Sequence, residues 1–439
     1  MRLDIPATLQ LLIIFSLVVI AVGRKVHLGL AAALGGIALA LWHGLRFTAI
    51  SGIVIGETLN PDTLLLLALM VCIMSFSAAM KKSGAMETLA RAIGTVTSSP
   101  RIAMAITPLL IGTLPMPGGA ILSAPLVEAI DIDHKEKAGT LSATNYWFRH
   151  SLELLWPLYP AFILTTSLSG ISVLRLMLLN SYSLPVIFTL GCVFVLPAAP
   201  RRSSHTSSSA IDRGSPLSRT TRFIKGIAPL AIVIFSYIFF DVLWRFISPG
   251  IDLAGSSKAL VGRYLPILLG LALGSLSLGY RAKGFGSFRG SVSMATMRLI
   301  AMILGIRIFS ALIGEIGLAG TAAAELTEAG IPPLVAVAVI PFIAGLVTGI
   351  GFGYVGLAIP IILGLVPEGS AFPREAAVVL AGAFGFAGMM MSPLHVCMVV
   401  SAEHFKAGLP ATIRRFALPL GIFLVIAVLY ALLLAGILG

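Results

Sequence analysis

Residues 76–84 read FSAAMKKSG, and residues 309–317 read FSALIGEIG. Phe76 aligns with Phe309 and Gly84 with Gly317, and the same offset continues through later Pro and Gly positions. The further pairs are Pro108 with Pro341, Gly112 with Gly345, Gly118 with Gly351 and, after a small drift, Pro125 with Pro360 and Pro157-Leu158 with Pro393-Leu394. A collinear series of helix-breaking residues indicates an internal repeat, because chance supplies only isolated matches in apolar sequence.

The composition indicates a membrane protein. Hydrophobic residues make up 58% of the 439 residues and charged residues only 11%, against about a quarter in soluble domains. The net charge of +12 does not indicate nucleic acid, since the Lys and Arg residues lie in short gaps between apolar runs. We expect a lipid bilayer as the surroundings and no nucleic-acid partner.

We predict an all-α polytopic membrane protein of about ten transmembrane helices and two re-entrant hairpins. A crossing takes about 20 apolar residues. The predicted crossings are 7–23, 26–42, 62–80, 151–170, 181–199, 226–247, 262–279, 293–314, 375–400 and 416–438. The apolar stretches 102–130 and 331–366 are interrupted by Pro and Gly, so each predicts a hairpin that is buried in protein. The first run lacks a small-residue cleavage site, which favours a retained helix over a signal peptide.

Charge distribution predicts the orientation. With the N-terminus outside, the predicted cytoplasmic segments hold 22 of the 30 Lys and Arg residues, the outer segments hold 7, and only Arg307 lies in mid-membrane. The positive-inside rule therefore places both termini outside the cytoplasmic (inner) membrane. The Ser- and Arg-rich stretch 201–225 is a predicted cytoplasmic linker, and contact with lipid headgroups is the alternative reading.

The linker divides the chain into two repeats, 1–200 and 226–439. Each repeat contains an odd number of crossings, so the second copy enters the membrane upside down. Inverted-topology repeats with interrupted segments in matching places are typical of secondary transporters, with the substrate site where the copies meet.

The two hairpin tips are candidate substrate sites. The first turns at Thr113 to Gly119, with Pro117, Gly118 and Gly119 at its centre, and the second contains Thr348, Gly349 and Gly351. Helix ends at such a break leave backbone groups without partners, and a bound ion can supply one. The alternative is a purely structural reversal. The formal GxGxxG of the second tip lacks the strand that a dinucleotide site requires, so we exclude that reading.

The densest polar segment is NYWFRHSLE, residues 145–153. Asn145, Arg149 and Glu153 recur every four residues and would share one face of a helix. Arg149 could hold a carboxylate by a bidentate contact, and His150 or Glu153 could carry a coupling proton. The alternative places 138–150 along the cytoplasmic interface, with Arg149 reaching the headgroups.

Two helix breaks lie at equivalent places in the repeats, at Pro157-Pro160 and at Ser392-Pro393. Freed carbonyls at these breaks could bind Na⁺ or the solute together with nearby polar side chains, and a kink that serves only packing is the alternative. The side chains are Thr113, Thr165, Thr166, Ser392 and His395.

Other polar residues admit structural readings. Arg307 needs a partner from another helix or from the substrate, whereas Asp241 and Arg245 have the spacing of a local ion pair. Cys72, Cys192 and Cys397 lie singly in apolar segments, which indicates core residues rather than disulfides or metal ligands.

The segments LPMPGGAILSAP (114–125) and NYWFRHSLELLWPLYP (145–160) resemble the prokaryotic membrane proteins grouped as "domain of unknown function 401", across nearly the whole chain. That family is similar to the wider ion-transporter superfamily, which includes carriers of citrate, dicarboxylates and gluconate. The resemblance implies two hairpins and broken helices around a central anion site, with elevator-type alternating access and cation coupling.

We therefore expect a secondary transporter of a small, anionic, carboxylate-type organic solute, driven by Na⁺ or H⁺. We expect no catalytic residue, no resident metal and no cofactor besides the coupling ion, and the sequence also admits a homodimer. An intramembrane enzyme using His150 and Glu153, or a channel, are the alternatives. The chain contains no HExxH motif and no GxSxG elbow.

Overall fold

The computed structural model describes residues 5–85, 88, 99–115, 119–131, 136–197, 216–330, 332–367, 369–370 and 372–438, without the side chains at 216–223, 225 and 333. Within these ranges no strand occurs, which confirms the all-α prediction. The helices of the first repeat are α1 (Ala7–Gly23), α2 (Leu28–Trp42), α3 (Phe47–Leu59), α4 (Pro61–Lys82), α6 (Pro100–Gly112), α7 (Ala120–Ile130), α8 (Ala138–Arg149), α9 (Pro160–Ser169), α10 (Val173–Leu179) and α11 (Ser183–Leu190), which continues as a π-helix over Gly191–Val195.

The helices of residues 216–438, in the predicted second repeat, follow in the same way. They are α12 (Pro216–Ile247), α13 (Gly255–Arg281), α14 (Met294–Ile316), α15 (Leu318–Glu328), α16 (Pro333–Thr348), α17 (Gly351–Leu365), α18 (Arg374–Met391), α19 (Val396–His404) and α20 (Leu409–Leu438). Local sequence explains where α4 begins. The Asn60 side chain accepts a hydrogen bond from the Asp62 N–H at 2.9 Å, and Pro61 occupies the first helical position.

Two of the pairs that the sequence alignment gives lie at corresponding places in the helices. Gly84 and Gly317 both have left-handed backbones (φ 72° and 69°) just after the ends of α4 and α14. A side chain would strain that conformation, which explains glycine in both copies. Pro108 and Pro341 both lie inside the first arm of a hairpin, α6 and α16.

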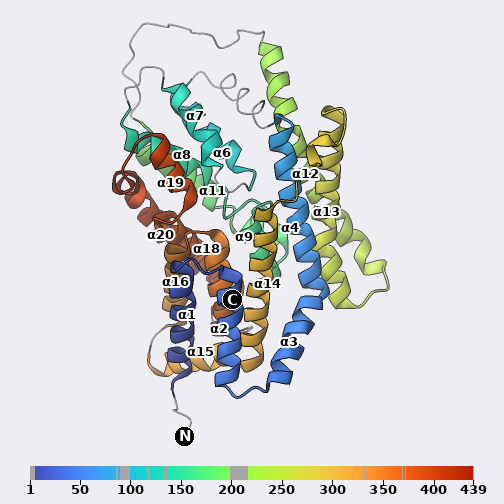
Figure 1. The fold of residues 1–439 in the computed structure, drawn as a ribbon, viewed down its shortest axis with the longest axis vertical. Coiled ribbons are helices and arrows are strands. Elements are labelled where there is room, and N and C mark those ends of the chain that lie inside the picture. The colour runs from blue at the N-terminus through green and yellow to red at the C-terminus, as the bar shows by residue number, and fades with distance from the viewer. Residues whose placement is uncertain are drawn as a thin grey trace.

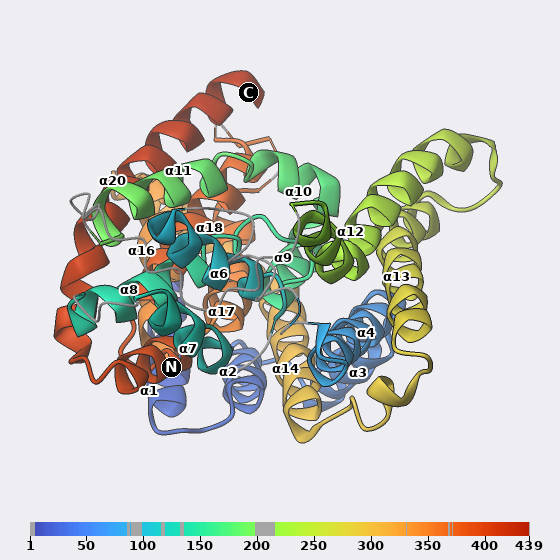
Figure 2. The same cartoon turned by 90° about the horizontal axis from the view of Figure 1, so that it is seen from above.

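The hairpins approach the centre from opposite ends of the molecule. Figure 1 shows α6 and α7 in the upper half and α16 in the lower half. The second arm of each hairpin packs on the short helix after the break in the other repeat, α7 on α19 and α17 on α9. Figure 2 shows α12 and α13 at one side, α8 and α20 at the other, and α6, α9 and α17 between them.

Glycines allow close helix packing around this centre. A Cβ atom on Gly305 of α14 would collide with the backbone of Gly29 on α2. On Gly388 of α18 it would collide with the carbonyl of Phe342 on α16. Small residues at helix crossings are typical of membrane proteins, where close packing stabilises helix pairs that share an apolar solvent.

The outer surface suits lipid. Large apolar side chains face outward along the long helices, such as Phe235 of α12 and Val425 of α20. Within the described ranges, six helical segments are long and apolar enough to cross a membrane, or seven if the bent pair α9–α10 is one span. The chain is thus a multi-pass membrane protein, and the total of about ten crossings stays a prediction.

Two expected crossings differ in the structure. The segment 151–170 is not one helix, because Ser151 to Tyr159 form turns before α9, and α9 and α10 meet at 107°. Pro157 and Pro160 remove backbone donors there. The segment 181–199 is helical only over Ser183–Val195, shorter than the roughly 20 residues of a crossing. The sequence reasoning also missed α3.

Candidate functional site

A cavity of about 510 Å³ lies where the two hairpin tips and the two helix breaks meet. The first repeat contributes Pro115 of the first tip and the broken segment after α8, and the second contributes the second tip, the start of α14 and the break before α19. The lining residues are Met74, Pro115, Arg149, His150, Glu153, Tyr159, Pro160, Ala161, Met294, Ala295, Arg298, Leu299, Met302, Gly349, Ile350, Gly351, Phe352, His395, Val396 and Cys397. This volume and mostly apolar lining are typical of a small-molecule site.

Aromatic side chains of the first break satisfy the carbonyls of the first hairpin. The Tyr159 hydroxyl donates to the Gly112 carbonyl at 2.6 Å, and the Trp156 indole N–H donates to the Thr113 carbonyl at 2.8 Å. These bonds hold the tip against the break. They also show that protein groups, rather than a ligand, partner these two carbonyls.

Arg149 is the last residue of α8 and is buried, with 3% of its surface exposed. Its guanidinium lies against Gly119, the residue that caps the N-terminus of α7, so closely that any Cβ there would collide with it. A helix N-terminus carries partial positive charge. The guanidinium and this helix end are both positive, so positive charge is concentrated beside the cavity.

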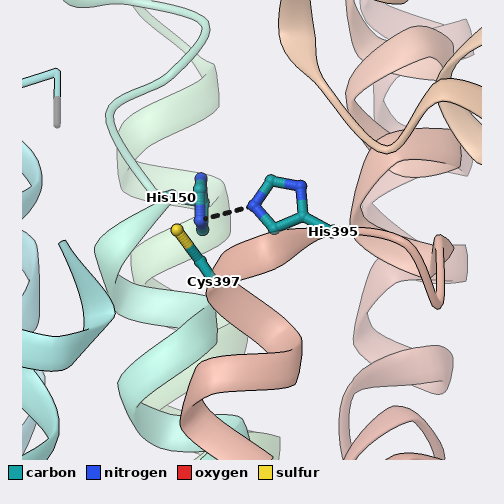
Figure 3. A group of neighbouring side chains, drawn as sticks. All are labelled: His150, His395 and Cys397. Carbon is teal, nitrogen blue, oxygen red and sulfur yellow. Dashed lines mark hydrogen bonds between the residues drawn. The ribbon is translucent and has the colours of Figure 1, made fainter. Parts of the chain in front are cut away.

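His150, Glu153 and His395 form a hydrogen-bonded chain. His150 Nδ1 lies 2.6 Å from Glu153 Oε2, and His150 Nε2 lies 3.2 Å from His395 Nε2 (Figure 3). Since a carboxylate accepts, Nδ1 of His150 carries a proton, and its Nε2 is then free to accept or to bind a cation. The edge of Tyr146 packs on both imidazoles and orients them.

The second hairpin tip completes the wall. Gly349 has a left-handed backbone (φ 64°) after α16, and the chain re-enters the helix at Gly351. Glu153 Oε1 lies beside Gly351, where a Cβ atom would be 2.9 Å from it. The N-terminus of α17 thus has a carboxylate next to it, the favourable arrangement.

The structure brings together Arg149, His150, Glu153, Gly349 and Gly351 with His395, all at the cavity. Pro117 and Gly118 lie outside the described residues. Leu141 to Arg149 are all buried in the protein, so Arg149 does not reach outward to lipid headgroups; the position of 138–150 along the membrane interface stays a prediction.

The remaining candidates do not line the cavity. Asn145 donates from Nδ2 to Ser401 Oγ at 2.8 Å and joins α8 to α19. Each threonine hydroxyl donates to a carbonyl of its own helix, and the Ser392 hydroxyl accepts from the Leu394 N–H at 3.2 Å. The threonine bonds run from Thr113 to Leu110, Thr165 to Ala161, Thr166 to Ile163 and Thr348 to Ala344.

Sequence reasoning missed Cys397 and Arg298, which both line the cavity. The interpretation of Cys397 as a core residue is incomplete, because it faces the two imidazoles in Figure 3. Its position two residues after His395, directly behind a break, was the available signal. Arg298 lies exposed near the start of α14. The residues around it in the sequence gave no indication that it lines a cavity.

A second buried cluster surrounds Arg307. Arg307 Nε lies 2.7 Å from Glu57 Oε1, and its NH2 lies 3.3 Å from Asp62 Oδ2. Arg263 NH1 contacts Asp62 Oδ1 at 2.7 Å. Ser167 donates to Asp62 Oδ2 at 3.0 Å and so joins α9 to the cluster. We call Glu57, Asp62, Ser167, Arg263 and Arg307 the Arg307 network.

The open question about Arg307 is answered by these protein partners. Asp241 and Arg245 form the expected local pair, with Arg245 Nε 2.8 Å from Asp241 Oδ2 and the Arg245 side chain half exposed.

Two helical hairpins, two broken helices and a central cavity make up the centre of this multi-pass membrane protein. The solved structure of the YdaH transporter from Alcanivorax borkumensis, reported to have an unusual topology, is similar: the sequences are 15% identical, 88% of this chain and 87% of that chain are covered, and the TM-score is 0.56. At this identity the likeness concerns the fold.

The chain belongs to the family described as "protein of unknown function (DUF401)", whose model matches residues 7–212 and 275–434. No curated protein matches it significantly. The expected family is thus confirmed.

Proposed function

We propose that this chain is a secondary active transporter of a small carboxylate-type organic anion, working by alternating access and coupled to Na⁺ or H⁺. The observation that carries the proposal is Arg149, held beside the N-terminus of α7 at a central cavity of small-molecule size. The transporter fold and the two opposed hairpins support it. We also propose kinship with the ion-transporter superfamily.

The formal charge of the lining favours an anion. The charged lining residues are Arg149, Arg298 and Glu153, two arginines against one carboxylate. Glu153 already has two favourable neighbours, the His150 imidazole and the N-terminus of α17. A solute carboxylate would therefore be attracted to the Arg149 side, while Met74, Leu299 and Phe352 would pack on an apolar body.

Glu153 and His150 are the better supported coupling groups. Their side chains share a 2.6 Å hydrogen bond at the cavity, and a proton that binds there would change the charge beside the solute. Of the hydroxyls proposed for Na⁺, those of Thr165 and Thr166 donate to carbonyls within α9. Glu153→Gln should abolish accumulation driven by a pH gradient in liposomes but leave solute exchange. Loss of Na⁺-driven accumulation alone would assign the coupling to Na⁺.

A thermal-shift screen of the purified full chain tests the substrate class. Mono-, di- and tricarboxylates should raise the melting temperature, and the matched neutral amides should not. A ligand at a hundred times its Kd stabilises by about 2.7 kcal/mol, which is readily measured. Equal effects of acid and amide would contradict an anion site. Counterflow exchange of a hit in liposomes then separates a carrier from a channel.

Orientation and assembly belong to the same proposal. The charge distribution supports an inner-membrane protein with both termini outside, and a homodimer is compatible with it. Cysteine labelling from either side of sealed vesicles, at Lys25→Cys and Lys258→Cys, would assign the two faces.

A further inference from the structure

We infer that His150, His395 and Cys397 bind one Zn²⁺-type metal ion at the cavity. Each residue offers one ligand atom, and the three atoms all lie within 4.8 Å of one another. Figure 3 shows the Cys397 sulfur and the His395 ring both directed toward His150. Two imidazoles and one thiolate are a ligand set that Zn²⁺ takes in proteins.

The spacing of the imidazoles fits a tetrahedral ion. Two nitrogens bound to one Zn²⁺ at about 2.0–2.1 Å lie about 3.3 Å apart at a tetrahedral angle. The Nε2 atoms of His150 and His395 lie 3.2 Å apart. An ion could therefore replace their hydrogen bond at nearly the same separation of the two nitrogens.

Glu153 supplies the outer contact that metal-bound histidines commonly have. A carboxylate that accepts from one ring nitrogen fixes the tautomer, so that the other nitrogen presents its lone pair to the metal. Glu153 Oε2 lies 2.6 Å from Nδ1 of His150, which leaves Nε2 facing His395. The ring of Tyr146 packs against both imidazoles in T-shaped contacts, with centroids 5.1 and 5.3 Å from theirs, and restricts both orientations.

Three protein ligands leave one position of a tetrahedral ion open. All three residues line the cavity, so the fourth ligand would come from that space, as water or as an oxygen of the solute. The ion would also join the two repeats, because His150 follows α8 whereas His395 and Cys397 belong to the second break. This inference goes beyond the proposed transport and does not depend on it.

Cobalt is a direct probe of the site, since a thiolate bound to Co²⁺ gives a charge-transfer absorption that imidazole alone does not. We would titrate the full-length protein, purified in detergent with a reductant and freed of metal by a chelator, with Co²⁺ and then with Zn²⁺. We expect one Co²⁺ per chain with a thiolate band, and displacement of Co²⁺ by one equivalent of Zn²⁺.

Matched variants locate the ligands. Cys397→Ser should remove the thiolate band and weaken binding at least tenfold, whereas Cys72→Ser, at an exposed cysteine, should leave both unchanged. His395→Gln should weaken binding while the band persists, and this keeps the test valid if Cys397→Ser does not fold.

Absence of stoichiometric Co²⁺ binding would overturn the inference, as would a thiolate band that survives in Cys397→Ser. The readout is metal binding alone, so a failed anion screen leaves it unaffected. Conversely, a protein that binds carboxylates but no Co²⁺ would refute the metal site and retain the proposed transport.

Discussion

Two polar clusters lie inside this membrane protein, and their charges are arranged differently. The Arg307 network pairs two arginines with two carboxylates, and its side chains bond to one another across five helices. The cavity carries two arginines against one carboxylate and has open space beside them. A balanced buried cluster holds a fold together, whereas a cluster with an excess of charge at a cavity can bind a ligand.

The Arg307 network should be the more damaging cluster to disturb. Asp62 bonds to Arg263, Tyr264 and Ser167 and pairs with Arg307, so Asp62→Ala would leave two partly buried arginines, with 17% and 11% of their side chains exposed, beside only one carboxylate. Removing one partner of a buried ion pair costs about 3–5 kcal/mol. We expect a strongly lowered melting temperature in detergent.

Asp241→Asn is the control for that loss, because its partner Arg245 has a half-exposed side chain that water can solvate. That change should cost about 0–1 kcal/mol. Equal losses in the two variants would remove the distinction between a closed network and an ordinary pair.

The cavity cluster should respond in binding rather than in stability. Arg149→Gln keeps a polar group against Gly119 but removes the charge. A hydrogen bond to a charged group is worth about 1.5–3 kcal/mol, so carboxylate affinity should fall by about 10- to 150-fold. Isothermal titration with a carboxylate hit measures this change.

The melting temperature of ligand-free Arg149→Gln should remain close to that of the parent. A large loss of stability with unchanged affinity would instead assign Arg149 to the same class as Asp62. Arg298→Gln, at the exposed rim of the cavity, should weaken binding less.

Glu325 of α15 lies outside both clusters, and we expect its substitution to change the stability only slightly. The backbone N–H of Thr8, and then that of Ala7 and the Thr8 hydroxyl, hold the pKa of this carboxyl below its ordinary value. Its stabilisation is thus present above the pKa of the unfolded chain and is lost as pH falls through the lower, folded pKa. Glu325→Gln should cost about 1 kcal/mol at neutral pH.

Melting curves at several pH values test this carboxyl. The gap between Glu325→Gln and the parent should close as the pH falls below about 4, where the parent becomes protonated too. A difference in melting temperature that does not change with pH would mean that the negative charge of Glu325 does not stabilise the start of α1.

Much of the architecture could be predicted because Pro and Gly interrupt or end the apolar helices. Gly84 and Gly317 mark the ends of α4 and α14, and Pro108 and Pro341 both lie inside the first arm of a hairpin. The cavity residues from 149 to 153 were detectable because four of these five neighbouring positions carry polar or charged groups in apolar surroundings.

Contacts between distant helices could not be predicted. Arg307 lies 250 residues from Glu57 and 140 from Ser167, and periodicity gives the face of a helix but not its neighbour. Cys397 was missed for a related reason, since its ligand-type neighbour His150 belongs to the other repeat. The sequence also does not show that the hydroxyls of Thr165 and Thr166 each donate within their own helix, and their role in ion binding stays a prediction.

The missing side chain at position 119 has a consequence for the movement of the first hairpin. The Arg149 guanidinium occupies the volume that a larger side chain at position 119 would fill, so the guanidinium is in direct contact with the backbone of Gly119. The hairpin cannot tilt away without changing what Arg149 rests on. In the proposed transport cycle, a tilt of this hairpin and a change in the surroundings of Arg149 would therefore occur together, and a single methyl group at Gly119 should disturb both.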